Sequence, residues 1–250
     1  MRLHIIVAAV VVVVPTAGCG SDSNSPSATT SSTSVSSTPA AASSPSSPTP
    51  LQVRPLVQLE QFKGVMPDAD EVGTAVKVLD LGISESHDSL RLLPDDYTSD
   101  MRCVGAVADA AIAPYSEGPV VLARTQDHAP TDHSGSFSAN TSAILYETAQ
   151  DAQDQVAATT DAWQGCAGKS IQVKTEPPVT YVIGAQTLLG GVPILVNNRT
   201  APEEPAWACG RGITSRSNVV IDLTVCGSDP GAVGADAAAL VGLIVAKVPA

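Results

Sequence analysis

The chain has 250 residues, a formal net charge of −12 at pH 7 and only 3% aromatic residues. An acidic balance of this size argues against nucleic acid and against an anionic membrane surface as direct partners, because both recruit basic surfaces. Arg2 and Asp22 are the charged residues before position 51, so the rest of the chain holds the whole net charge. Residues 51–250 are numerous enough for one domain with a proper hydrophobic core.

The first segment has the features of an export signal. Arg2 gives it a positive start, and residues 5–14 form an unbroken apolar stretch. That stretch is too short to span a bilayer, which requires about 20 residues. Small residues then lead to Cys19 in a pattern that resembles the lipobox of bacterial lipoproteins, with Thr16 where leucine is usual. The resemblance implies that residues 1–18 are removed. Cys19 would then carry acyl chains such as palmitate and anchor the protein on the extracytoplasmic face of the cell membrane.

The next segment is predicted to be a disordered tether. Of the 30 residues from 21 to 50, 23 are Ser, Thr or Pro. Such a segment has almost nothing to bury, so it cannot offset the entropy cost of becoming ordered. We therefore expect three parts in the chain, namely the signal (1–18), the lipidated cysteine with its tether (19–50) and a folded domain (51–250).

The folded domain alternates helical and extended patterns. Residues 66–72 are predicted to open a short helix, and further helices are predicted at 103–112 and 148–164. A closing helix is predicted from 229 onward, where apolar residues recur every three to four positions, namely Val233, Ala237, Leu240, Val241, Ile244 and Val248. Strands are predicted at 119–125, 136–146, 171–174, 179–183, 194–196, 207–214 and 219–225. This order predicts an α+β domain with a mostly antiparallel sheet packed against helices.

Four cysteines remain after Cys19, and an even number in an exported domain implies two disulfides. No C-x-x-C pair occurs and the compartment is oxidising, so neither a zinc site nor any other metal or cofactor site is expected. The four cysteines of the domain are Cys103, Cys166, Cys209 and Cys226.

One pairing follows from a predicted hairpin at residues 207–225. A two-residue turn at Ser217 and Asn218 places Cys209 directly opposite Cys226, where cross-strand side chains come closest. Cys103 is then left to pair with Cys166.

The hairpin register also divides the side chains between two faces. Arg211, Asp222 and Thr224 share the face of Cys209 and Cys226, which is therefore the more polar one. The opposite face is apolar.

No segment gives a convincing catalytic motif. Residues 126–134 hold two Asp-His pairs, with His128 and His133, but their spacing is not that of H-E-x-x-H. We interpret them as a solvated turn between strands, and the nucleophile elbow G-x-S-x-G does not occur. Residues 184–191 are glycine-rich but lack the lysine of a P-loop, which favours a hairpin loop. No catalytic residue is assigned, and the chain is predicted not to be an enzyme.

Two tryptophans lie close to cysteines in the sequence. For Trp163 and Trp207, packing against a disulfide is favoured over anchoring a ligand, although pockets often use tryptophan. No ligand-binding residue is assigned from the sequence.

Several motifs together resemble the PknH-like extracellular domain family. They are residues 103–107, 163–166, 207–213 and 218–226, together with the closing helix. This family forms the exported sensor half of some actinobacterial Ser/Thr kinases and also stands alone in lipoproteins. The resemblance implies the same two disulfides and a twisted antiparallel sheet with a cleft for an unidentified ligand. The kinase motifs are missing from this sequence, which excludes direct kinase signalling.

The sequence therefore indicates an exported, lipid-anchored domain that binds an unidentified small molecule or protein partner without catalysis. Two alternatives remain open. An envelope lipid or glycan hydrolase would require distant His, Asp and Ser residues to converge in one cleft. A carrier of an apolar molecule would require a deep cavity lined by Val, Ile and Leu, whereas a sensor predicts a shallower and more polar groove.

Overall fold

The structure is a computed structural model that describes residues 55–200 and 207–249. The chain divides into two units, Met1–Pro50 and Leu51–Ala250, and the description concerns the second. Cys19, the signal and the tether lie outside the described residues. Within the described ranges, no helix is both long and apolar enough to cross a membrane.

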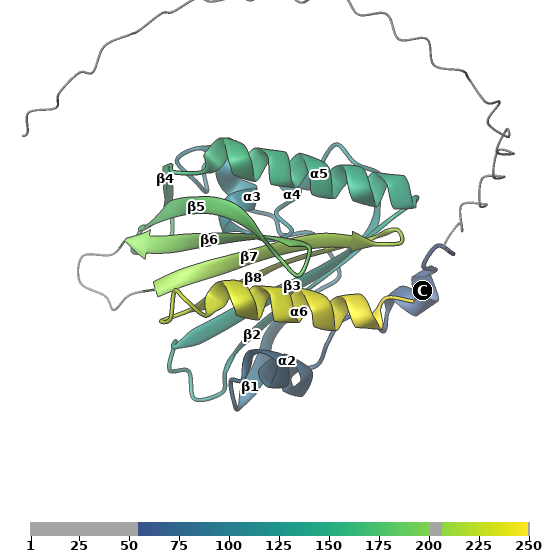
Figure 1. The fold of residues 1–250 in the computed structure, drawn as a ribbon, viewed down its shortest axis with the longest axis horizontal. Coiled ribbons are helices and arrows are strands. Elements are labelled where there is room, and N and C mark those ends of the chain that lie inside the picture. The colour runs from purple at the N-terminus through teal and green to yellow at the C-terminus, as the bar shows by residue number, and fades with distance from the viewer. Residues whose placement is uncertain (1–54, 201–206, 250) are drawn as a thin grey trace, which may run out of the picture. The chain divides into compact units, whose positions relative to one another are not determined.

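An eight-stranded antiparallel sheet forms the centre of the domain, with helices on both faces (Figure 1). The sheet order is β1-β2-β3-β8-β7-β6-β5-β4. The strands are β1 (Leu81–His87), β2 (Val120–Pro130), β3 (Phe137–Tyr146), β4 (Ser170–Val173), β5 (Val179–Leu189), β6 (Val192–Thr200), β7 (Trp207–Arg216) and β8 (Val219–Gly227). The α+β class and the antiparallel sheet are as predicted.

One sheet face packs against α2 (Ala69–Val76) and α6 (Val233–Lys247), with α1 (Leu59–Phe62) preceding them. The side chains of β8 at odd positions, such as Ile221 and Leu223, point to this face and meet the buried stripe of α6. The members of that stripe were all predicted from their spacing, namely Val233, Ala237, Leu240, Val241, Ile244 and Val248.

The other sheet face packs against α5 (Ala149–Cys166), α3 (Val104–Val107) and α4 (Ile112–Tyr115), with a short 3-10 turn at Met101–Cys103. Trp163 of α5 is fully buried here, in the same cluster as Cys103 and Cys166. Thr148 caps α5 by accepting a hydrogen bond from the Asp151 N–H, which explains why the helix begins at Ala149.

Both disulfides have the predicted pairing. Cys103 is bonded to Cys166, which joins the start of α3 to the end of α5, and Cys209 is bonded to Cys226. In the hairpin, Cys209 lies opposite Cys226 in the register that the two-residue turn predicts. The prediction from local geometry is confirmed.

The sequence predictions for residues 103–112 and 81–87 were wrong. The predicted helix over 103–112 is broken at residues 108–111, where Ala110 adopts a left-handed φ of 45°. Residues 81–87, where no strand was predicted, form the edge strand β1. Both differences come from contacts with distant parts of the sheet, because β1 pairs with β2 and the N–H of Ala110 bonds to Asp222.

Candidate functional site

The structure separates the two histidines that lie close in the sequence. Residues 126–130 belong to β2, so their interpretation as a solvated turn was wrong. His128 is buried, with its Nε2 3.3 Å from the hydroxyl of Thr141. Burial lowers the pKa of His128 to about 4, which leaves the ring neutral at pH 7. His133 lies on the exposed loop that follows, so the two rings do not form one site.

A buried arginine lies at the centre of the sheet face beneath α5. The side chain of Arg211 on β7 is fully buried, and its Nη2 is 2.6 Å from Asp222 on β8. It donates to the hydroxyl of Thr224 at 2.6 Å and, from Nε and Nη2, to the carbonyl oxygen of Gly105 at 3.3 and 3.1 Å. A further bond to the carbonyl oxygen of Leu223 completes the set. All five N–H groups of the guanidinium therefore have acceptors.

The partner carboxylate is equally enclosed. The second oxygen of Asp222 accepts hydrogen bonds from the backbone N–H of Ala110 and the hydroxyl of Tyr115, both at 2.8 Å. Burial raises the pKa of Asp222, and the nearby charge of Arg211 opposes that rise. Burial and the neighbouring Asp222 also raise the pKa of Tyr115, which keeps its hydroxyl protonated as the donor.

A second ion pair extends this cluster toward the surface. Asp109 accepts from the hydroxyl of Ser142 at 2.7 Å and from Arg91 Nε at 3.2 Å, and it lies 3.4 Å from the hydroxyl of Thr224. The Nη1 and Nη2 atoms of Arg91 also donate to the two carboxylate oxygens of Asp127 on β2. Burial alone would lower the pKa of Arg91, but the two carboxylates outweigh it and raise the pKa. The polar residues of this sheet face thus form one continuous chain of contacts.

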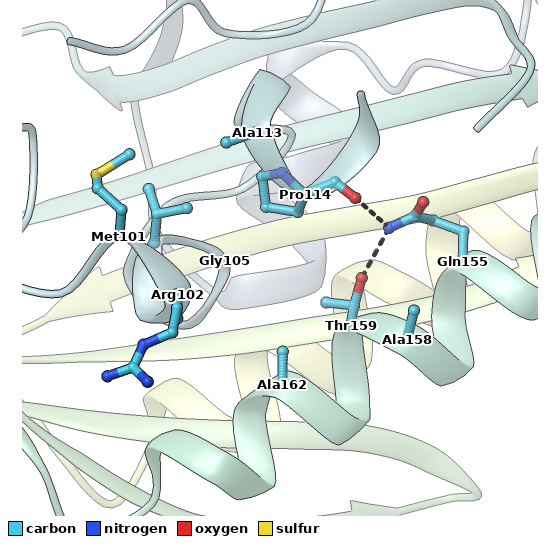
Figure 2. Close-up of a pocket in the computed structure, with 10 residues that line it drawn as sticks. Met101, Arg102, Gly105, Ala113, Pro114, Gln155, Ala158, Thr159 and Ala162 are labelled. Carbon is cyan, nitrogen blue, oxygen red and sulfur yellow. Dashed lines mark hydrogen bonds between the residues drawn. The ribbon is translucent and has the colours of Figure 1, made fainter. Parts of the chain in front are cut away.

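A groove opens above this chain, between α3 and α4 on one side and α5 on the other (Figure 2). Its volume is about 220 Å³. Gln155 of α5 spans one part of it, donating to the carbonyl oxygen of Pro114 and to the hydroxyl of Thr159, both at 3.0 Å (Figure 2). The lining residues are Met101, Arg102, Val104, Gly105, Ala113, Pro114, Gln155, Ala158, Thr159 and Ala162.

Small side chains make the walls of the groove apolar, whereas its mouth carries a charge. Ala158 and Ala162 lie one turn apart on α5, so both face the groove. The side chain of Arg102 is 84% exposed and pairs with Asp100. The volume is below the roughly 300–1,000 Å³ of pockets for drug-sized ligands, so it suits one side chain of a partner or a small ligand.

The groove is joined to the buried ion pair through one carbonyl group. The oxygen of Gly105, a lining residue, accepts from Trp163 Nε1 at 2.8 Å as well as from Arg211. The guanidinium of Arg211 lies 5.6 Å from the Trp163 ring centroid, within cation–π range. Trp163 is therefore a packing residue beside the Cys103–Cys166 bridge, and its indole N–H donates to Gly105, which lines the groove.

Sequence reasoning placed Arg211, Asp222 and Thr224 on the right face but missed two members of the cluster. Asp109 interrupts an apolar, alanine-rich stretch, and a lone charge in such a stretch is the signal that could have identified it. Arg91 lies in a loop without periodicity and gave no such signal. In the part of the chain that the structure describes, no three His, Cys, Asp or Glu side chains are grouped as metal ligands would be.

The comparisons agree with this architecture. The profile of the PknH-like extracellular domain matches residues 57–247. The crystal structure of the extracellular domain of PknH from Mycobacterium tuberculosis superposes with a TM-score of 0.70 at 19% identity, covering 77% of this chain and 97% of that one. At this identity the likeness shows the fold alone.

Curated relatives match over a shorter range. The serine/threonine-protein kinases PknH of Mycobacterium bovis (strain ATCC BAA-935 / AF2122/97) and Mycobacterium tuberculosis (strain ATCC 25618 / H37Rv) are 31% identical over 88 residues. That range is 35% of this chain and spans 15% and 14% of the two kinases, respectively. Because the family profile covers most of the described domain, the chain belongs to the PknH-like extracellular domain family.

Proposed function

We propose that this protein is an exported lipoprotein whose domain binds a ligand or a protein partner outside the cell membrane, in a sensor-like and non-catalytic role. The export signal and the cysteine at position 19 support the membrane anchor. Membership of an extracellular family supports the location of the domain. The match spans only 15% and 14% of the two curated kinases, so no kinase activity is carried over.

The observation that carries the binding role is the groove between α3–α4 and α5. Its small apolar walls can enclose one side chain or a similar group, and its charged mouth at Arg102 can orient a polar one. Binding energy at interfaces is concentrated where an anchor fills such a pocket. A groove of about 220 Å³ with a polar rim fits a sensor better than a carrier, which would need a deep apolar cavity.

Filling the groove is expected to abolish binding. Ala158 lines the groove and is exposed, so Ala158→Trp would occupy the space without disturbing the core. Ala157 is exposed on the same helix and is not a lining residue, so Ala157→Trp is the matched control. The full-length proteins would be cross-linked in the envelope of the native host, purified and weighed by native and denaturing mass spectrometry.

We expect a bound molecule or a cross-linked polypeptide on the wild type and on Ala157→Trp, and at least a tenfold loss on Ala158→Trp. Equal occupancy of both variants would show that the groove is not the binding site.

Lipidation of Cys19 is a separate prediction. Two or three acyl chains hold a protein firmly on a membrane, whereas an unlipidated acidic domain has no such affinity. The wild type is expected in the detergent phase after phase separation, with a mature mass that includes acyl chains. Cys19→Ala is expected in the aqueous phase, and Ser21→Ala should behave as the wild type. A wild-type protein that is recovered in the aqueous phase without added mass would contradict the anchor.

A further inference from the structure

A second hollow, separate from the groove, lies at the end of β1. Its volume is about 350 Å³, and it shares no lining residue with the groove. This volume is within the range of small-molecule sites. The lining combines three leucines with four residues that carry hydrogen-bonding groups, namely Leu90, Leu92, Leu93, His87, Ser89, Arg91 and Thr125.

Arg91 is a fixed donor in this hollow. Its backbone is held from both sides, since its N–H donates to Ala110 and its carbonyl oxygen accepts from Ile112. Its guanidinium uses three N–H groups on Asp109 and Asp127. Two N–H groups on the Nη atoms have no acceptor within the described residues, and the side chain keeps 17% exposure. Because Arg91 lines the hollow, these N–H groups are the donors that it has left for an acceptor atom of a ligand.

Thr125 supplies a second polar group without a partner. The residue is fully buried, and its hydroxyl has no hydrogen-bond partner in the described part of the chain. A buried hydroxyl without a partner costs about 1–3 kcal/mol of folding free energy. A bound molecule with a polar oxygen would remove that cost, and Thr125 is a lining residue of the hollow.

The charges around Arg91 define the class of ligand. One guanidinium faces two carboxylates, those of Asp109 and Asp127, so this group of three carries a net negative charge. A carboxylate or phosphate group would be repelled by that excess. A cation would be repelled by the guanidinium of Arg91 and has no lone pair to accept from its remaining N–H groups. A neutral group with acceptor oxygens meets neither obstacle.

We propose that this hollow binds a neutral, oxygen-rich head group attached to a short apolar chain. The head accepts hydrogen bonds from Arg91 and Thr125, and the apolar part packs on the leucines. An acyl ester and a glycolipid sugar share this chemistry. The site is distinct from the groove, so it does not depend on the proposed function.

The class of ligand can be tested with four probes that share a six-carbon chain. Hexyl glucoside and methyl hexanoate have neutral heads, hexanoate is an anion and hexylammonium is a cation. They would be titrated by calorimetry into the Cys19→Ala full-length protein, which carries no lipid. We expect at least one neutral probe to bind ten times more tightly than either charged probe, and the better of the two distinguishes a sugar head from an ester.

Two exposed leucines supply a matched pair of variants. Leu92 and Leu79 are each 84% exposed, but only Leu92 lines this hollow. Leu92→Ala removes apolar contact with the chain and is expected to weaken binding at least fivefold, whereas Leu79→Ala should leave it unchanged. Thr125→Val is expected to weaken binding as well. Its control is Thr187→Val, at an exposed position of β5, which should leave the affinity unchanged.

Three results would overturn the site. They are the absence of binding by both neutral probes, equal or tighter binding of a charged probe, and the same affinity for Leu92→Ala and Leu79→Ala. Because both leucines are exposed, a change in binding for one of them alone cannot be attributed to unfolding.

Discussion

Asp222→Ala is expected to lower the free energy of unfolding by about 3–5 kcal/mol, because it leaves the charge of Arg211 buried without a counter-ion. Native domains are stable by only about 5–15 kcal/mol, so this loss is a large part of the total. The variant also leaves the N–H of Ala110 and the hydroxyl of Tyr115 without an acceptor, since both donate to Asp222. Urea unfolding followed by the fluorescence of buried Trp163 would measure the loss.

The control is a double-mutant cycle with Arg211→Met. Removing both charges avoids an unpaired buried ion, and exchanging buried ion pairs for apolar side chains often costs little. The double variant is therefore expected to lose much less than the sum of the two single losses. Additive losses would contradict the ion pair, since they would mean that the two side chains do not interact.

Gly210→Ala is expected to destabilise the domain by about 3 kcal/mol, because α6 packs directly on the backbone of β7. A Cβ at this position would lie 2.2 Å from the carbonyl oxygen of Val233 and 2.6 Å from its carbon. Those atoms are backbone, so α6 would have to move away from the sheet, and overpacking of this kind typically costs about 1–3 kcal/mol or occasionally more.

Gly242→Ala provides the comparison on α6 itself. A Cβ there meets nothing within 4 Å, and alanine is favoured over glycine in a helix by about 1 kcal/mol. Urea unfolding should therefore show a loss for Gly210→Ala and a small gain for Gly242→Ala. If Gly210→Ala were as stable as the wild type, the close contact between α6 and β7 would be wrong.

The elements that could be predicted are those set by short-range patterns. The register of the Cys209–Cys226 hairpin follows from a two-residue turn and the two-residue period of strands, and it is observed. The closing helix follows from apolar spacing. The same alternation placed Arg211 and Asp222 on one face, although it could not show that α5 would cover that face completely.

The elements that could not be predicted depend on distant partners. Arg91 bonds to Asp109 and Asp127, which are 18 and 36 positions away. Such pairings cannot be predicted from the residues that neighbour Arg91 in the sequence. Residues 108–111 favour a helix by composition, but the carboxylate of Asp222 captures the N–H of Ala110 across the fold. Tertiary contacts override helix propensity at that point. The groove itself arises from this break, because the break separates α3 from α4.

The Cys103–Cys166 bridge determines how the groove can change its width. It ties the first residues beside α3 to the last turn of α5, so the walls are covalently joined at the end near Arg102 and Ala162. At the other end, α5 is held to α4 by the hydrogen bond from Gln155 to Pro114. The groove is therefore held by a covalent bond at one end and by a hydrogen bond between side chain and backbone at the other. For a ligand larger than the resting volume, the walls would have to separate at the Gln155 end, where separation costs one hydrogen bond and no covalent bond.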